Sequence, residues 1–308
     1  MLNNKKNKRG ELTTQQIVLL IILILSFIIL LYFLIKLNLG QESEAEVCHN
    51  SIVLRSNKLI PTESVPLKCE TQYVCITKDG TCEQFLKPEK VKVKTSDEVY
   101  QALALELSDC WWMFGEGELN YIGKEAFPEM YCSFCAQVAF DDSVKGISGF
   151  ESGEFDKENF YKYIAETKMN EKEITYSEYL YGTNNYNSFL NLENISSVSF
   201  GKINLDKQYK VLIGVTSDVS KLGYAVGGAI GGGIIATGII LAPFTGSASL
   251  WASFAIVGGA SAATGTGAYF LAPVVQSTWG GEMIPPSLIE SPSEELNSIG
   301  CKNIETLS

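Results

Sequence analysis

Two stretches of the chain lack the mixture of apolar and polar positions that a globular surface requires. Residues 17–35 form an apolar run in which Ser26 is the one small polar residue. About 20 such residues in a helix cross the hydrocarbon core of a bilayer. Residues 222–281 contain no Asp, Glu, Lys or Arg. The pattern predicts a transmembrane anchor within residues 17–38 and further membrane spans within residues 221–276.

The second stretch is predicted to form a hairpin of two transmembrane helices, residues 222–242 and 249–272, with Pro243 as the breaker. Small residues recur every four positions along both helices, a spacing that lets helices approach closely in lipid. The predicted helix-packing residues are Gly223, Gly227, Gly231, Gly259, Ala263 and Gly267. Packing on each other and packing on neighbouring copies both fit this pattern. A helical hairpin buried in a soluble core is the alternative.

The region between the two stretches has the patterning of a folded body. Apolar residues at helical spacing predict a helix that starts at a Ser96 cap, ends at Gly115 and Gly117, and buries one face. That face comprises Val99, Leu103, Leu107, Cys110 and Phe114. For the neighbouring pair Trp111–Trp112, core packing is favoured over a contact with a membrane or partner.

A second helix is predicted over residues 155–169, with Phe160 and Ile164 facing inward. β-Branched and aromatic residues predict strands at 133–141, 196–203 and 208–216. The predicted fold is therefore a membrane protein with an N-terminal anchor helix, a disulfide-containing α+β ectodomain and a C-terminal glycine-rich helical hairpin. Its expected parts are a basic tail (1–16), the anchor (17–38), a Cys/Pro-rich ribbon region (39–92), the α+β domain (93–220), the hairpin (221–276) and a tail (277–308).

Charge is distributed unevenly along the chain. Its first sixteen residues carry four basic side chains and Glu11, a net +3, whereas the whole chain carries −11, so the remainder carries −14. Because basic flanks stay in the cytoplasm, we expect a cytoplasmic N-terminus, with the body and C-terminus outside the cell membrane. The acidic body has a single arginine, Arg55. This composition argues against nucleic-acid binding, which needs clustered Lys and Arg.

Eight cysteines are present, an even number that predicts disulfides in an exported domain. They are Cys48, Cys69, Cys75, Cys82, Cys110, Cys132, Cys135 and Cys301. Alternating residues around Asp79-Gly80 predict a β-hairpin with a two-residue turn. In that register Cys75 and Cys82 are diagonal neighbours about 7–8 Å apart, beyond the usual reach of a disulfide. We therefore predict that these two do not pair with each other, and that Cys48 and Cys69 are their nearest partners.

The spacing of Cys132 and Cys135 is C-x-x-C, which is used in redox pairs, zinc sites and structural disulfides. Thioredoxin-like proteins, which share this tetrad, place it at the start of a helix, whereas a strand is predicted after Cys135. Zinc usually needs four ligands, and the chain has no second C-x-x-C and one histidine, His49. We predict structural disulfides with no metal or cofactor, and retain a thiol oxidoreductase as an alternative.

Catalytic signatures are not found in the sequence. His49 would be the only histidine available to activate a nucleophile. Asp141-Asp142 could bind a cation, but solvated turn residues are the simpler interpretation, and the glycine-rich segment 227–233 lacks the following Lys-Ser/Thr of a phosphate loop. Asn194 begins a glycosylation sequon. We therefore predict no catalytic residues and no enzymatic activity.

The opening segment "KKNKRGELTTQQIVLLIILI" resembles class III, prepilin-like signals, and with the Arg-poor composition it resembles envelope proteins of small-genome archaea. This resemblance, within residues 5–25, implies cleavage after Gly10 with the apolar helix retained. The expected function is that of a membrane-anchored cell-envelope protein acting by interaction. Expected partners are membrane lipid, copies of itself or other envelope proteins. An oligomeric membrane assembly, pore or secretion component is the alternative.

Overall fold

The computed structural model describes residues 14–36, 43–61, 64–122, 131–170, 172–182, 201–216, 252–258, 269–276, 282–292 and 302–303. The chain divides into two compact units, Met1–Ser43 and Glu44–Ser308. Several predictions lie outside the described residues. They concern the signal-like segment before Thr14, Cys301, the sequon at Asn194, the first helix of the glycine-rich hairpin, and the packing residues Gly223, Gly227, Gly231, Gly259, Ala263 and Gly267.

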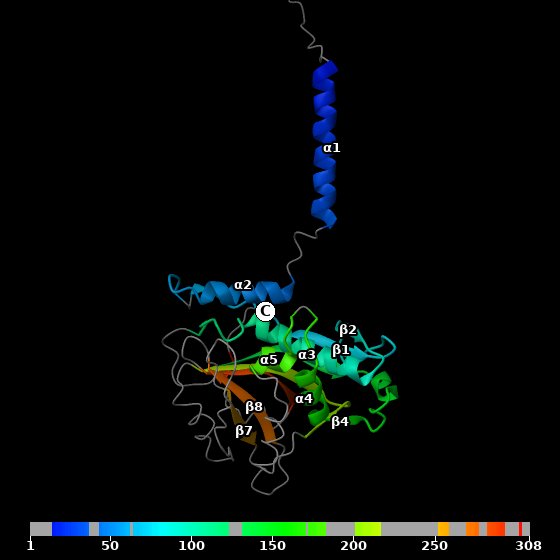
Figure 1. The fold of residues 1–308 in the computed structure, drawn as a ribbon, viewed down its shortest axis with the longest axis vertical. Coiled ribbons are helices and arrows are strands. Elements are labelled where there is room, and N and C mark those ends of the chain that lie inside the picture. The colour runs from blue at the N-terminus through cyan, green and yellow to red at the C-terminus, as the bar shows by residue number, and fades with distance from the viewer. Residues whose placement is uncertain are drawn as a thin grey trace, which may run out of the picture. The chain divides into compact units, whose positions relative to one another are not determined.

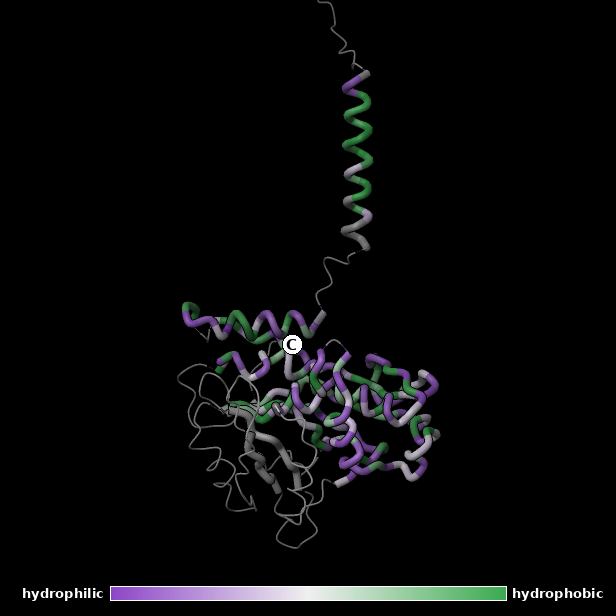
Figure 2. Tube along the Cα trace, in the orientation of Figure 1, coloured by the Kyte–Doolittle hydropathy of each residue, from purple (hydrophilic) through white to green (hydrophobic). Residues whose placement is uncertain are grey.

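The apolar run of the first unit forms helix α1, Thr14–Lys36. Much of this helix consists of hydrophobic residues (Figure 2). However, among the described residues no helix combines the length and the apolarity that a membrane crossing requires. The predicted transmembrane anchor is therefore wrong, although its helical conformation is confirmed. An apolar run is sufficient to predict a helix, but crossing a bilayer also requires enough uninterrupted apolar length.

The second unit is organised around an eight-stranded mixed sheet in the order β2-β1-β3-β6-β9-β8-β7, with β10 also paired to β3 (Figure 1). Strands β2, β1 and β3 are parallel to one another, and β3, β6, β9, β8 and β7 pair antiparallel in turn. The strands are β1 Gln72–Thr77, β2 Glu89–Lys92, β3 Tyr131–Phe140, β6 Gln208–Thr216, β7 Ala252–Gly258, β8 Tyr269–Gln276, β9 Glu282–Ser291 and β10 Lys302–Asn303.

Strands β7 and β8 contradict the predicted membrane hairpin. They lie within or across the end of the helix predicted at 249–272, and they pair antiparallel from Ala252↔Val275 to Gly258↔Tyr269. The physical reason is the placement of β-forming residues. Aromatic and β-branched residues are concentrated in the two strands, whereas residues 259–268 between them are small or polar. The uncharged segments Ala252–Gly258 and Tyr269–Gln276 are strands of a sheet, and their backbone groups pair with neighbouring strands.

Helix α3, Ser96–Met113, is the centre of the helical layer. It contacts strands β3, β6 and β9, and helices α2, α4 and α5 pack beside it (Figure 1). These helices are α2 Glu44–Arg55, α4 Lys157–Glu166 and α5 Tyr176–Tyr181. A short 3-10 helix, η2 Asp142–Gly146, follows β3, and a small antiparallel sheet pairs β4 Glu154–Asp156 with β5 Lys202–Asn204.

The predicted face of α3 is confirmed, since Val99, Leu103, Leu107, Cys110 and Phe114 are all buried. One detail differs, because the N-cap is the residue before Ser96. The Thr95 hydroxyl accepts a hydrogen bond from the Glu98 backbone N–H, as an N-cap side chain does. The predicted glycine stop is confirmed by left-handed φ angles of 79° at Gly115 and 78° at Gly117.

The remaining described elements follow the sequence pattern closely. Helix α4 buries Phe160 and Ile164 as predicted. Strands β3 and β6 match the predictions at 133–141 and 208–216. Of the strand predicted at 196–203, the described part is the beginning of β5.

Candidate functional site

Disulfides join distant parts of the second unit, which confirms the prediction of disulfide bonding. The structure contains Cys48–Cys69, Cys75–Cys82 and Cys110–Cys135. Cys132 is also disulfide-bonded, and the described residues include no free cysteine. Cys135 therefore pairs with α3 rather than with its C-x-x-C neighbour.

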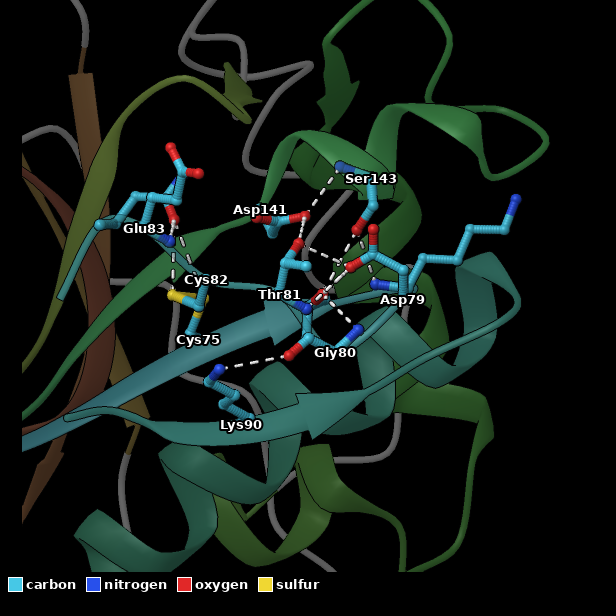
Figure 3. The surroundings of a disulfide bond; sticks show 12 residues. Cys75, Asp79, Gly80, Thr81, Cys82, Glu83, Lys90, Asp141 and Ser143 are labelled. Atoms are coloured by element: carbon cyan, nitrogen blue, oxygen red, sulfur yellow. Dashed lines mark hydrogen bonds between the residues drawn. A yellow bond between two sulfur atoms is a disulfide. The ribbon is translucent and has the colours of Figure 1, made fainter. Parts of the chain in front are cut away.

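The pairing of Cys75 with Cys82 corrects the predicted hairpin (Figure 3). Strand β1 pairs in parallel with β2, so the residues after Thr77 belong to a connecting loop rather than to a returning strand. In this loop an Asp79 carboxylate oxygen accepts hydrogen bonds from the Thr81 backbone N–H at 2.8 Å and hydroxyl at 2.7 Å. This turn brings the Cα of Cys82 to 6.4 Å from that of Cys75, within the range of a disulfide.

A network of polar side chains lies where the parallel strands β1 and β3 end (Figure 3). An Asp141 oxygen accepts hydrogen bonds from the Thr81 hydroxyl at 3.1 Å and from the Ser143 backbone N–H at 3.0 Å. Asp142 pairs with Lys145 at 2.9 Å. The two aspartates thus cap and stabilise the turn around η2. Among the described residues no group of three potential ligands could hold a metal ion.

A pocket of about 600 Å³ lies in the helical layer, between α2, α3, the turn that follows α3, and α5. The residues that give it chemical character are His49, Asp109, Trp112, Glu116, Lys172 and Tyr179. They come from four segments of the chain, so the fold of the helical layer assembles the pocket.

Two disulfides hold the helices that line this pocket. Cys48, the residue before His49, joins α2 to Cys69. Cys110, the residue after Asp109, joins α3 to strand β3 through Cys135. The pocket-lining side chains of both helices are therefore adjacent to covalent attachments.

One wall of the pocket is aromatic. The His49 ring stacks on Trp112 with a centroid distance of 4.3 Å and an interplanar angle of 11°. His49 Nδ1 lies 2.8 Å from the Trp112 carbonyl oxygen, which can only accept, so Nδ1 carries the proton in this bond. The tryptophan pair is divided between two roles, because Trp111 is buried in the core while Trp112 is half-buried and lines the pocket.

The lining also holds a carboxylate, a phenol and an ammonium group in mutual contact. Glu116 has a left-handed φ of 54° and its carboxylate accepts a hydrogen bond from the Tyr179 hydroxyl. Lys172 Nζ lies 3.5 Å from the Glu116 carboxylate and 3.8 Å from the centroid of the Tyr179 ring. Burial, and then the bond to Glu116, raise the pKa of Tyr179, so the phenol remains a donor.

Carboxylates dominate the α3 side of the pocket. Within the described part of the chain, Asp109 has no hydrogen-bond or ion-pair partner, although it is accessible to solvent. Loss of hydration against the surrounding protein raises its pKa, and the charge of Glu89 adds to the effect. Three residues earlier on the helix, burial raises the pKa of Glu106 to about 8, with further contributions from Asp109 and Glu89. Ionisation of both carboxyl groups is therefore less favourable than in water.

Sequence patterns indicate only part of this site. His49 and Trp112 stand out in the sequence, whereas Asp109, Glu116, Lys172 and Tyr179 belong to no motif and come together only in the folded chain. Comparison with protein-family models, with curated proteins and with solved structures finds no match to this chain.

Proposed function

We propose that this protein acts by binding, in an extracytoplasmic compartment, through the pocket between α2, α3 and α5. The compartment is supported by the disulfides, which form and persist in oxidising environments. The compartment can be tested by applying an impermeant amine-reactive reagent to intact cells that produce the chain. Labelling before lysis is expected, and labelling only after lysis would contradict the assignment.

The observation that carries the proposal is the covalent attachment of two of the helices that line the pocket. Disulfides attach α2 beside His49 and α3 beside Asp109. A site whose walls are already ordered loses less conformational entropy when a ligand enters, which favours affinity. Rigid walls with mixed aromatic and charged groups are characteristic of recognition sites.

Binding is favoured over catalysis by the way the titratable groups are engaged. Glu116, Tyr179 and Lys172 contact one another, so each of these groups already has a partner. Groups held in such contacts define the shape and charge of a surface. A general acid or base would instead have to reach a proton on the substrate.

Two neighbouring residues on α2 offer a matched test. Both side chains are exposed, but Val53 lines the pocket and Leu54 does not. A Val53→Trp substitution should obstruct the pocket without disturbing the core, and Leu54→Trp adds the same side chain elsewhere on the helix. Saturation-transfer NMR with n-butylamine, n-butanol and butyrate, on the full chain, should show at least one signal that Val53→Trp removes and Leu54→Trp preserves. If no signal depends on Val53, the pocket is not a binding site.

A further inference from the structure

The charged groups that line the pocket do not balance. Among the described residues that line it, the carboxylates of Asp109, Glu116 and Glu118 outnumber the single ammonium group, that of Lys172. Glu89 lies close enough to Asp109 for its charge to raise the pKa of that carboxyl group, after the effect of burial. A ligand with a positive charge would offset this excess, whereas an anion would be repelled.

The pocket already contains one example of the contact that such a ligand would make. The Lys172 ammonium group lies over the face of the Tyr179 ring, 3.8 Å from its centroid, and 3.5 Å from the Glu116 carboxylate. An ammonium group between an aromatic face and a carboxylate gains from both the ring quadrupole and the opposite charge. The Glu116 carboxylate and the Tyr179 ring are therefore already in contact with a cation of the chain itself.

The same pocket is also lined by a second carboxylate, that of Asp109, and by the indole of Trp112, one face of which stacks on His49. Asp109 and Trp112 are three residues apart on α3, so their side chains lie on the same face of the helix. Trp112 is half-buried, and the Asp109 carboxylate has no hydrogen-bond or ion-pair partner in the described ranges. Among aromatic side chains, indole gives the strongest cation contact.

We propose that the pocket binds a protonated amine on an apolar stem, with its ammonium group at the Asp109 carboxylate beside Trp112. This inference rests on the proposed function, because it names the ligand of the same pocket. The stem lies along the apolar part of the lining, to which Val53, Leu119 and Met169 contribute. A lysine side chain of a partner and a free alkylamine share this chemistry. A metal ion does not fit, because the described residues provide no set of three ligands.

Calorimetric titration of the full chain tests the charge requirement. The probes are n-butylamine and Nα-acetyl-lysine methylamide, each compared with a neutral counterpart, n-butanol and the Nε-acetylated lysine derivative. We expect both amines to bind at least about tenfold more tightly than their neutral counterparts, as for the loss of a charged hydrogen bond. Tighter binding of the lysine derivative than of butylamine assigns a protein partner, and equal binding assigns a free amine. Equal binding of the amines and their neutral counterparts would overturn the proposal.

Two pairs of variants separate a local contact from the general attraction of an acidic protein. Asp109→Asn should weaken amine binding about tenfold, while Asp97→Asn, the same change at an exposed position on the same helix, should not. Lys172→Met should tighten amine binding roughly threefold by removing the competing ammonium group. Its control, Lys168→Met, changes the net charge equally but removes only the surface pair with Glu173.

The outcomes distinguish the two proposals. If Asp109→Asn and Asp97→Asn have equal effects, or if Lys172→Met weakens binding, the cation site is refuted. If butanol or butyrate binds in a manner that depends on Val53 while the amines do not, the pocket remains a binding site for another class of ligand. If no probe depends on Val53, the proposed function fails as well.

Discussion

Replacing Glu106 with glutamine should stabilise the protein, and the gain should grow as the pH rises. Glu106 is partly buried on α3, and its carboxyl group is close to Asp109 and Glu89. Burial first, and then these two charges, raise its pKa from 4.5 to about 8. Ionisation of Glu106 is therefore less favourable in the folded protein than in the unfolded chain.

The sign of the effect follows from the number of protons bound. Below about pH 4.5 both states hold the proton, so Glu106 does not affect the pH dependence. Between 4.5 and 8 the unfolded chain has released the proton while the folded protein retains it, and stability falls as the pH rises. Above the folded pKa the penalty is complete. The rise in pKa from 4.5 to about 8 corresponds to a ceiling of about 5 kcal/mol.

Urea unfolding of the wild-type chain and Glu106→Gln at several pH values measures this dependence. The free energies of unfolding should differ by a similar amount at about pH 3 and pH 4, and the variant should gain roughly 3 kcal/mol by about pH 7. Glu166→Gln is the control, because Glu166 is an exposed carboxylate at the end of α4. Parallel pH profiles for the wild type and Glu106→Gln would refute the assignment of a strongly perturbed carboxyl group.

Two further predictions concern buried and covalent groups. The Tyr121 hydroxyl is buried without a hydrogen-bond partner among the described residues, so Tyr121→Phe should leave stability unchanged or raise it by about 1 kcal/mol in urea unfolding. Tyr209→Phe removes a hydroxyl bonded to the Asn204 backbone and should instead lower stability by about 1 kcal/mol; the opposite ranking would contradict the assignment. Cys82 is half-exposed while the other described cysteines are buried, so mass spectrometry after limited thiol treatment should find Cys75–Cys82 reduced first, and earlier reduction of another bond would refute this.

Local patterns in the sequence were sufficient where a single element determines its own burial. The spacing of Val99, Leu103 and Leu107 identified the buried face of α3, and β-branched residues identified β3 and β6. These signals depend on the periods of the helix and the strand, which any segment carries in its own residues. The end of α3 was also predictable, because its glycines adopt the left-handed conformation that other residues avoid.

Strand partners could not be predicted in the same way. Asp79-Gly80 has the composition of a hairpin turn, but β1 pairs with β2, whose first residue is twelve positions after Thr77. The partner of a parallel strand depends on the topology of the whole sheet, and the residues next to the strand do not indicate it. The error propagated to the cysteines, since the inferred separation of Cys75 and Cys82 depended on an antiparallel register.

The uncharged C-terminal region shows a related limit of hydropathy. Absence of charge indicates that a segment avoids water, but it does not distinguish a helix in lipid from a strand in a sheet. Strands β7 and β8 occupy the parts of this region in which aromatic and β-branched residues are concentrated. The local content of aromatic and β-branched residues indicates the strands at Ala252–Gly258 and Tyr269–Gln276 better than overall apolarity does.

The backbone at Glu116 connects the predictable end of α3 with the pocket that could not be predicted. Glu116 lies between Gly115 and Gly117. Among the described residues that are not glycine, it is the one with a positive φ, 54°. A left-handed conformation costs a side-chain-bearing residue about 1 kcal/mol or more, and it persists only where the surroundings enforce it. Here the enforcing contacts are those of its carboxylate with Tyr179 and Lys172, both in the pocket wall. Strain of this kind is concentrated at functional sites, so the backbone at Glu116 supports the proposed binding site in addition to its volume and its lining.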